Sequence, residues 1–369
     1  MDARAQRCET LDALRGIAAL SVVFWHWQWL YWPPGTSALI SDQSVEPLFR
    51  VLSPLYQEGL WGVEMFFSIS GFVFFYLYAD AIAQRKTTLL AFVNYRFSRL
   101  YPLHLLTLLI VTVLQALYFR RYGAFFVYHL NDGRHFVLQL FLASNWSRQD
   151  PLTFNGPTWS LSIEVLLYAM FFALAFARLT RPVVVAAFAL FGAAIFREYM
   201  LIGEGMLSFF SGGLCFYLVS AWRSERRIDR TSALSMVAVI CGAIAIQQIG
   251  NDLTFAERFT EIVAFPAIII GLAANEDRLK SAVSRLRWLG NISYSSYLLH
   301  FPLALLLVTV AGYAGIVLNP SSPWLLLGYL AALVALSLAS FHYFERPMQR
   351  LLRARAKPQQ ALAKSGEAA

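Results

Sequence analysis

Two ionisable residues interrupt the first apolar segment of this chain. Arg15 and His26 lie eleven residues apart within residues 11–27, where most other side chains are apolar. On an α-helix this separation corresponds to about three turns and about 16 Å of rise, so we expect both side chains on one face. Because an ionisable side chain is costly inside a bilayer, the pair indicates a functional site. An imidazole accepts a proton near neutral pH, as a general base acting on a hydroxyl must.

A second set of basic residues has the chemistry of a phosphate site. Arg96 and Arg99 lie one helical turn apart at the start of an apolar segment, and guanidinium groups bind phosphate through paired hydrogen bonds. Together with Arg15, they could form a phosphate site that faces the cytoplasm. Ordinary topology signalling explains Arg96 and Arg99 equally well, and Arg15 alone could extend to the lipid headgroups.

An acidic residue is predicted inside another apolar helix. Asn155 or Gly156 can cap this helix and Pro157 suits its first turn. Glu164 then lies about 10 Å inside the outer membrane edge, where a carboxyl group must pair or stay protonated. It could orient a histidine, bind sugar hydroxyls, or form a structural salt bridge with an arginine.

Three further residues are candidates to line a substrate site: Ser70, Tyr294 and His300. Ser70 belongs to a run of small residues, for which helix packing is the leading interpretation. Ser296 and His300 are helix neighbours at i and i+4, so a serine–histidine nucleophile pair is conceivable. No acid is evident nearby, and polar packing between helices explains most of this segment.

The composition is that of a membrane protein. Hydrophobic residues make up 58% of the 369 residues and charged residues 14%, whereas soluble proteins are nearer a quarter charged. The apolar blocks are continuous rather than alternating, which favours helices over a barrel. We therefore expect an all-α polytopic protein with about ten spans, namely 11–32, 59–80, 98–119, 156–178, 182–197, 206–222, 231–249, 262–275, 291–313 and 323–344.

The positions of the basic residues predict the orientation. Lys and Arg concentrate in the segments that share a side with the N-terminus, which places both termini in the cytoplasm. The net charge of +8 is thus explained without nucleic acid. The three cysteines have no metal-binding spacing, and we expect no metal. We expect a membrane domain over residues 1–347 and a basic, disordered cytoplasmic tail over 348–369.

One predicted outer loop, residues 120–155, is basic despite its location. It carries Arg120, Arg121, Arg134 and Arg148, which could meet an anionic glycan or the lipid headgroups. Its apolar segment 136–143 is too short to span a bilayer and could be re-entrant or interfacial.

Six motifs in order along the chain resemble the acyltransferase-3 family of integral membrane O-acyltransferases. They are the Arg15–His26 spacing, FFSISGF at 66–72, RFSRLYP at 96–102, WSLSIE at 159–164, LGNISY at 289–294 and FERP at 344–347. The resemblance implies a ten-helix domain in the bacterial inner membrane. It implies transfer of an acyl group, usually acetyl, from cytoplasmic acyl-CoA to a hydroxyl of an extracytoplasmic glycan or lipid-linked sugar. It further implies that Arg15 and His26 are essential and that Arg96 and Arg99 take part.

Several alternatives stay open at this level. His26 could deprotonate the acceptor hydroxyl or could itself become acylated, and acyl-CoA is a donor substrate rather than a bound cofactor. A transporter or flippase for a lipid-linked sugar would also use intramembrane Arg, His and Glu, although no two-fold repeat is evident. A third hypothesis is that the protein is a non-catalytic subunit of a polysaccharide-export complex. The acyl group, the acceptor, the oligomeric state and the role of the 120–155 loop are undetermined by the sequence.

Overall fold

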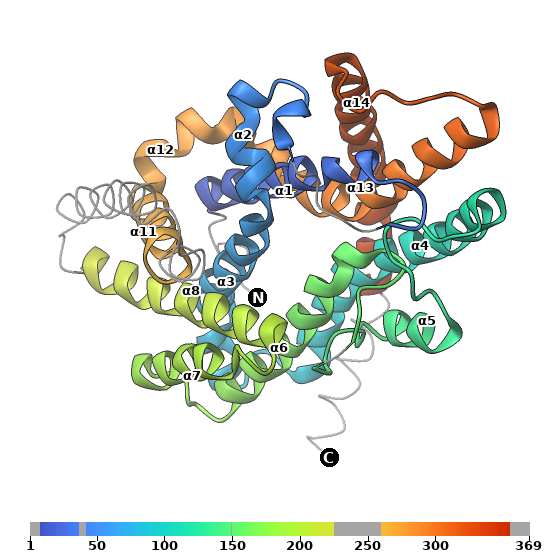
Figure 1. Ribbon diagram of the computed structural model, residues 1–369. Helices are drawn as coiled ribbons and strands as arrows, with labels where there is room; N and C mark the ends of the chain where they lie inside the picture. Colours follow the sequence, from blue (N-terminus) through green and yellow to red (C-terminus); the bar gives the residue numbers. More distant parts are fainter. Residues whose placement is uncertain (1–7, 37–41, 149, 225–259, 355–369) are drawn as a thin grey trace. The chain divides into compact units, whose positions relative to one another are not determined.

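Helices are the only regular secondary structure in the part of the chain that the computed structural model describes, residues 8–36, 42–148, 150–224 and 260–354 (Figure 1). A helix satisfies all of its backbone polar groups within one segment, which is what a bilayer core demands. The expected all-α class is therefore confirmed.

Six helical segments are long and apolar enough to cross a membrane: 49–83, 89–122, 156–176, 200–223, 276–314 and 323–354. Two shorter apolar helices cover 182–195 and 262–274. The expected span at 231–249 lies outside the described residues, as does the tail beyond residue 354. A polytopic membrane protein is thus supported, while the count of about ten spans and the orientation of the termini stay predictions.

The first helix differs from its prediction at its end. Helix α1 covers Glu9–Trp25, and the chain then tightens into a 3-10 helix, η1, over His26–Tyr31. We expected one α-helix to carry both Arg15 and His26. Arg15 does lie in α1, but His26 lies just beyond its end, in η1. In a 3-10 helix the side chains at i and i+3 eclipse, so His26 comes into line with Trp29.

The start of α1 is held by a carboxylate from a distant segment. Glu276 accepts hydrogen bonds from the amide nitrogens of Glu9, at 2.8 Å, and Thr10, at 3.1 Å. The first amides of a helix have no partner within the helix and carry its positive dipole end. Glu276 thereby anchors the segment that carries Arg15. Its short helix α12 was not among the predicted elements.

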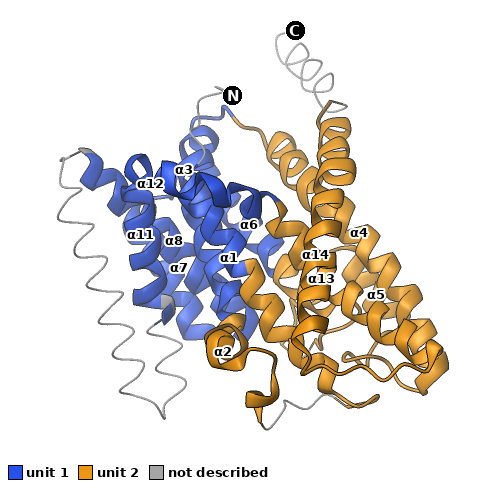
Figure 2. Cartoon of the chain, turned by 90° about the horizontal axis from the view of Figure 1, so that it is seen from above, with its two compact units in different colours: residues 1–18, 61–86, 163–291 blue, residues 19–60, 87–162, 292–369 orange. Residues whose placement is uncertain are grey.

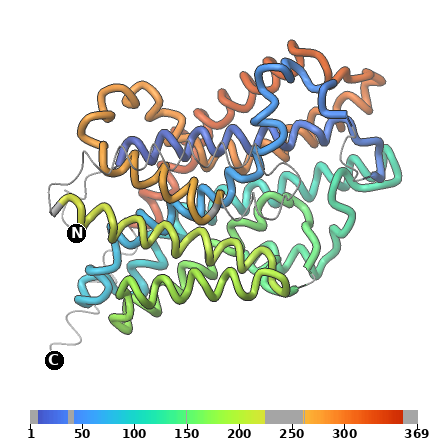
Figure 3. The backbone as a smooth tube through the Cα atoms, turned by 60° about the vertical axis from the view of Figure 1, so that its left-hand side comes forward, coloured from blue at the N-terminus to red at the C-terminus, as the bar shows by residue number. Residues whose placement is uncertain are grey.

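The chain divides into two compact units (Figure 2). Unit 1 comprises residues 1–18, 61–86 and 163–291. Its helices are α3 (Gly62–Ala83), most of α6 (Trp159–Phe176), α7 (Pro182–Ile195), α8 (Met200–Ser224), the π-helical turn η5 (Thr260–Ala264), α11 (Phe265–Ala274) and α12 (Glu276–Val283). Figure 3 shows α7 and α8 lying side by side, in agreement with their close packing.

Small residues bring α3 and α8 into backbone contact. A Cβ atom added to Gly71 would lie 1.8 Å from the carbonyl oxygen of Phe209, and one added to Gly212 would lie 1.9 Å from that of Ser68. Contacts this short exclude any side chain at either position. The interpretation of the 66–72 motif as a packing surface is supported by this contact.

Unit 2 comprises residues 19–60, 87–162 and 292–369. Its elements are η1, η2 (Gln43–Val45), α2 (Phe49–Glu58), α4 (Leu89–Tyr122), α5 (Gly133–Leu140), η4 (Gly156–Thr158), most of α13 (Arg287–Ala314), α14 (Pro323–Ala339) and the π-helical turn η7 (Ser340–Glu345). An aromatic core built around Trp29, Phe301 and Tyr329 joins these segments. Trp29 of this core stacks on the ring of the candidate histidine, His26.

Candidate active site

The His26 imidazole is buried against an aromatic wall. Its ring stacks on that of Trp29, with centroids 3.9 Å apart and planes 30° apart. Trp29 in turn makes an edge contact with Phe301 at 5.2 Å. His26 is only 8% exposed, so the residue as a whole is buried with a small accessible part.

A second histidine contacts the edge of this ring. Nε2 of His300 lies 3.1 Å from Nδ1 of His26, and Nδ1 of His300 lies 2.6 Å from the carbonyl oxygen of Tyr297. His300 is almost completely buried. Its own carbonyl accepts a hydrogen bond of 2.7 Å from the hydroxyl of Tyr329. His300 was predicted as a substrate-lining residue, and the structure gives it a direct partner in His26.

The other polar residues of α13 are used for packing. Ser296 donates to the carbonyl of Ser293 at 3.2 Å, which agrees with polar packing, the leading interpretation, rather than with the serine–histidine pair that the i, i+4 spacing allowed. Tyr294, also predicted to line a substrate site, donates its hydroxyl to the carbonyl of Leu100 on α4. Tyr294 thus fixes α13 to α4, and the hydroxyl of Ser296 is used within its own helix.

A proline in α13 leaves a carbonyl for a side chain to satisfy. Pro302 has no N–H to donate to the carbonyl of Leu298, four residues earlier. Asn155 fills this role, because its Nδ2 donates to that carbonyl at 3.1 Å. Asn155 is the N-cap residue of η4 and Pro157 lies in the first turn, as predicted, but the Asn155 side chain makes no cap bond and binds the Leu298 carbonyl instead.

The arginines of the 96–102 motif lie in the first part of α4. A C-terminal residue, Arg353, contacts this part of the helix. Nε of Arg353 donates to Oγ of Ser98 at 3.0 Å, and its guanidinium lies over the ring of Tyr95 at 5.1 Å. Glu345 is the nearby acid that attracts Arg99. Arg96 is half-buried. Three basic groups therefore gather in this part of unit 2.

Glu345 explains the 344–347 motif. Its Oε1 accepts hydrogen bonds from the hydroxyls of Ser295 and Ser340, the latter at 3.0 Å. The carboxylate thereby ties the turn η7 to α13. The sequence assigned this motif no role, and the structure assigns it a packing role.

Arg15 lies in the other unit. Its Nη1 is 3.3 Å from Oδ1 of Asp12, and its side chain is 15% exposed. Arg15 belongs to unit 1, whereas His26, Arg96 and Arg99 belong to unit 2. A joint site of these four residues stays a prediction.

Glu164 and Ser70 are brought together inside unit 1. Oγ of Ser70 donates to Oε1 of Glu164 at 3.3 Å, and the hydroxyl of Tyr168 donates to the same oxygen. Tyr168 is also stacked on Phe74, with ring centroids 4.3 Å apart. The sequence reasoning missed Tyr168, although its i+4 position relative to Glu164 was a usable signal. The arrangement is a partly buried carboxylate with two hydroxyl donors.

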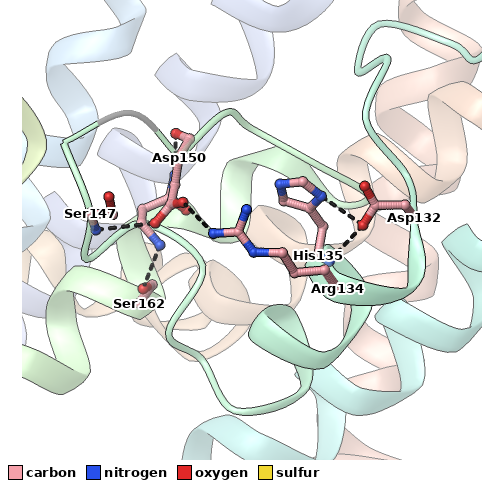
Figure 4. Close-up of polar contacts among 7 residues, drawn as sticks. Asp132, Arg134, His135, Ser147, Asp150 and Ser162 are labelled. Carbon is pink, nitrogen blue, oxygen red and sulfur yellow. Dashed lines mark hydrogen bonds and ion pairs between the residues drawn. The ribbon is translucent and has the colours of Figure 1, made fainter.

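The basic loop is ordered by its own acids (Figure 4). Oδ1 of Asp132 accepts from the backbone nitrogen of His135 at 2.9 Å and pairs with its Nδ1 at 2.8 Å. These hydrogen bonds lower the pKa of Asp132 below its usual value. Arg134 pairs with Asp150 at 3.7 Å, and Asp150 also accepts from the amide of Ser147 at 3.1 Å. The loop is therefore a folded element rather than a loose tether.

The short helix α5 carries the loop back to α4. The carbonyl of Gln139 lies 2.8 Å from Nε2 of His104, which is near the middle of α4. The Gln139 side chain donates to the carbonyl of Thr153 at 3.0 Å and accepts from the hydroxyl of Thr158 at 2.9 Å. These contacts pack α5 against α4, and the choice between a re-entrant and an interfacial segment stays a prediction. His104 and Gln139 are a buried polar pair that the sequence analysis did not single out.

No group of three potential metal ligands occurs among the described residues. A cavity of about 90 Å³ lies in unit 1 between the middle of α3, the end of α8 and the start of α12, beside Cys8, Arg223 and Lys280. Burial raises the pKa of the Cys8 thiol to about 12. This thiol is therefore protonated at neutral pH and is a poor nucleophile.

These features define the class of protein: an all-helical membrane protein with a buried, hydrogen-bonded histidine. Comparison with known sequences gives the family. The family model described as "Acyltransferase domain", that of the acyltransferase-3 family, matches residues 9–342. The chain belongs to this family, as its motifs predicted.

One characterised relative bears on the activity. The chain is 31% identical over 173 residues to the protein named Acyltransferase MdmB of Streptomyces mycarofaciens. The match covers 46% of this chain and 40% of that relative, so it spans less than half of either protein. No solved structure matches the chain.

Proposed function

We propose that this acyltransferase is a membrane O-acyltransferase. It takes an acyl group, acetyl in the first instance, from cytoplasmic acyl-CoA. It delivers this group to a hydroxyl of an extracytoplasmic glycan or lipid-linked sugar. Family membership supports acyl transfer, and the observation that carries the proposal is the buried His26 imidazole with one ring nitrogen bonded to His300.

His26 acts on the acceptor hydroxyl in this scheme. The ring takes the hydroxyl proton while the oxygen bonds to the thioester carbonyl carbon. The carbon–sulfur bond then breaks, the ester is formed, and the CoA thiolate takes the proton from the imidazolium. The aromatic wall of Trp29 and Phe301 excludes water, which otherwise hydrolyses the thioester.

A covalent route uses the same ring. A nitrogen of His26 bonds to the thioester carbonyl carbon and the carbon–sulfur bond breaks, so CoA leaves as its thiolate. The acceptor oxygen then bonds to the acyl carbon, the carbon–nitrogen bond breaks, and the hydroxyl proton neutralises the thiolate. Incubation with radiolabelled acetyl-CoA in the absence of acceptor separates the two routes. A hydroxylamine-sensitive label that is lost in His26→Ala favours the covalent route, whereas a ternary complex detected by steady-state kinetics favours direct transfer.

The arginines are assigned to the donor. In our proposal Arg15, Arg96 and Arg99 hold the phosphates of acyl-CoA. Arg353 donates to Ser98, which lies between Arg96 and Arg99 in the sequence, and this concentration of guanidinium groups at the start of α4 supports an anion site. Guanidinium groups suit phosphate because of their fixed, paired donors.

The Glu164 cluster is assigned to the acceptor. Glu164 with the hydroxyls of Ser70 and Tyr168 forms a polar group of the kind that binds sugar hydroxyls. In the proposed topology the chain crosses a bacterial inner membrane about ten times, with both termini in the cytoplasm, and Glu164 lies in the outer half.

The test follows CoA release from acetyl-CoA by the full chain in nanodiscs, with and without an extracytoplasmic glycan fraction. His26→Ala is compared with His129→Ala, which changes an exposed histidine. We expect release that requires both the glycan and His26, and we expect His129→Ala to retain it. If no acyl-CoA supports release and none binds, the proposal fails. Movement of a lipid-linked sugar across vesicles would then establish the transporter instead.

A further inference from the structure

The hydrogen bonds around His300 determine which of its nitrogens carries a proton. Nδ1 of His300 is 2.6 Å from the carbonyl oxygen of Tyr297, and a carbonyl can only accept. Nδ1 must therefore bear the hydrogen. In the neutral ring, Nε2 then has a lone pair and no hydrogen.

The same reasoning extends to His26. Its Nδ1 lies 3.1 Å from Nε2 of His300, so His26 must be the donor in this bond when both rings are neutral. A neutral His26 with its hydrogen on Nδ1 has its lone pair on Nε2.

We propose that His300 is a positioning residue that holds His26 in this tautomer and thereby presents the Nε2 lone pair to the substrate. The proposal rests on the proposed function, since it assigns His26 the reacting nitrogen. It holds for both chemical routes, because proton removal and attack on the thioester each require a lone pair on the exposed nitrogen. In either route Nδ1 of His26 keeps its hydrogen.

The surroundings of His300 make it a rigid acceptor. Its ring edge is bonded to Tyr297, its carbonyl to the hydroxyl of Tyr329 at 2.7 Å, and its side chain is 1% exposed. The His26 ring is meanwhile held on one face by Trp29. A flip of the His26 ring would move Nδ1 away from His300 and a carbon into its place. The bond therefore fixes both the tautomer and the ring orientation.

His26 rather than His300 is the ring that meets the substrate. Both nitrogens of His300 are engaged, one with Tyr297 and one with His26, and its side chain has almost no exposed surface. His26 keeps one nitrogen outside this chain of bonds and has more of its surface exposed, at 8%. This difference assigns contact with the substrate to His26 and the positioning role to His300.

The direct test is nitrogen-15 NMR of the full chain in nanodiscs with labelled histidine, because the two ring tautomers have distinct shifts. The His26 signals are identified by their loss in His26→Gln. We expect wild-type His26 to carry hydrogen on Nδ1, and His300→Ala to give a mixture of tautomers. If wild-type His26 carries its hydrogen on Nε2, the proposal is overturned whether or not the protein is active.

Kinetics supply the functional readout. By analogy with residues that orient metal-bound histidines, loss of the partner in His300→Ala is expected to lower kcat by about 10- to 100-fold with little change in the KM for acyl-CoA. His300→Gln places an amide oxygen near the position of Nε2 and should recover most of this loss. Equal loss in both variants, with unchanged NMR signals of His26, would show that His300 only fills space.

The outcomes separate this inference from the proposed function. The Nδ1 tautomer in a chain that never consumes acyl-CoA would leave the inference about the pair standing and would refute the acyltransferase chemistry. If the chain is active and the His26 tautomer does not change in His300→Ala, the inference about the pair is refuted and the acyltransferase chemistry stands.

Discussion

Nδ2 of Asn155 donates to the carbonyl of Leu298 at 3.1 Å, and this carbonyl is the one that Pro302 leaves without its helical partner. The bond joins the start of the WSLSIE helix to the part of α13 that carries His300. A buried carbonyl without a partner is costly, so the side chain of Asn155 and the proline act as a pair.

The first prediction concerns this pair. Asn155→Ala should lower the free energy of unfolding by about 1–3 kcal/mol, because it leaves the Leu298 carbonyl unsatisfied. In a Pro302→Ala background the helix supplies its own N–H, and Asn155→Ala should then cost less. Thermal unfolding of the four proteins in detergent measures this coupling. Additive effects of the two substitutions would contradict the explanation.

A second prediction concerns pH. Glu46 is 3% exposed and its Oε2 has no hydrogen-bond partner among the described residues, and burial raises its pKa from 4.5 to about 7. The folded state therefore holds this proton more tightly than the unfolded state. Its contribution to stability is complete below about pH 4.5 and is lost as the pH rises to about 7.

Glu46→Gln isolates this effect. The variant should unfold at a higher temperature than wild type at pH 8, and the difference should shrink or reverse at pH 4.5. Unfolding midpoints measured across this range test the prediction. A constant difference between the two proteins at every pH would exclude Glu46 as the titrating group.

A third prediction concerns the contact between α3 and α8. Gly71→Ala places a methyl group 1.8 Å from the Phe209 carbonyl, so the helices must separate. We expect a loss of about 1–3 kcal/mol or more and a lower yield of monodisperse protein. Gly328→Ala in α14 is the matched control, since a Cβ atom there meets nothing within 4 Å. The control should be neutral or slightly stabilising, and equal behaviour of both variants would refute the close contact.

A fourth prediction concerns the acceptor. If Glu164 binds sugar hydroxyls, Glu164→Gln should raise the KM for the glycan by about tenfold, the equivalent of one charge-assisted hydrogen bond. The KM for acyl-CoA should not change. Ser70→Ala should have a smaller effect, because its hydroxyl is 3.3 Å from the carboxylate. Steady-state kinetics with each substrate varied in turn decides this, and a parallel rise in both KM values would indicate a structural role.

Local pattern accounts for much of the architecture. The expected segments 59–80, 98–119 and 206–222 fall within the continuous helical segments 49–83, 89–122 and 200–223 of the structure, because long apolar blocks can satisfy their backbone only as helices. The family was recognised from short motifs at fixed order for a similar reason. Each motif sits at a helix end or a helix contact, where only certain residue types fit.

The errors also have physical causes. Helix spacing made Ser296 and His300 neighbours, but it does not determine whether a serine hydroxyl turns to a histidine or to a carbonyl of its own helix. Spacing also treated residues 11–32 as one α-helix, although the stacking of His26 on Trp29 accompanies a 3-10 helix.

The sequence by itself determined the class of this protein, its helical segments and the residue types capable of chemistry. These properties depend on composition and on how apolar and polar residues are spaced over a few positions of the chain. Only the tertiary structure decided the partners: His300 for His26, 274 residues away, and Glu164 for Ser70, 94 residues away. Periodicity reports which face of a helix is apolar, whereas the neighbour that this face meets depends on the packing of all the helices together.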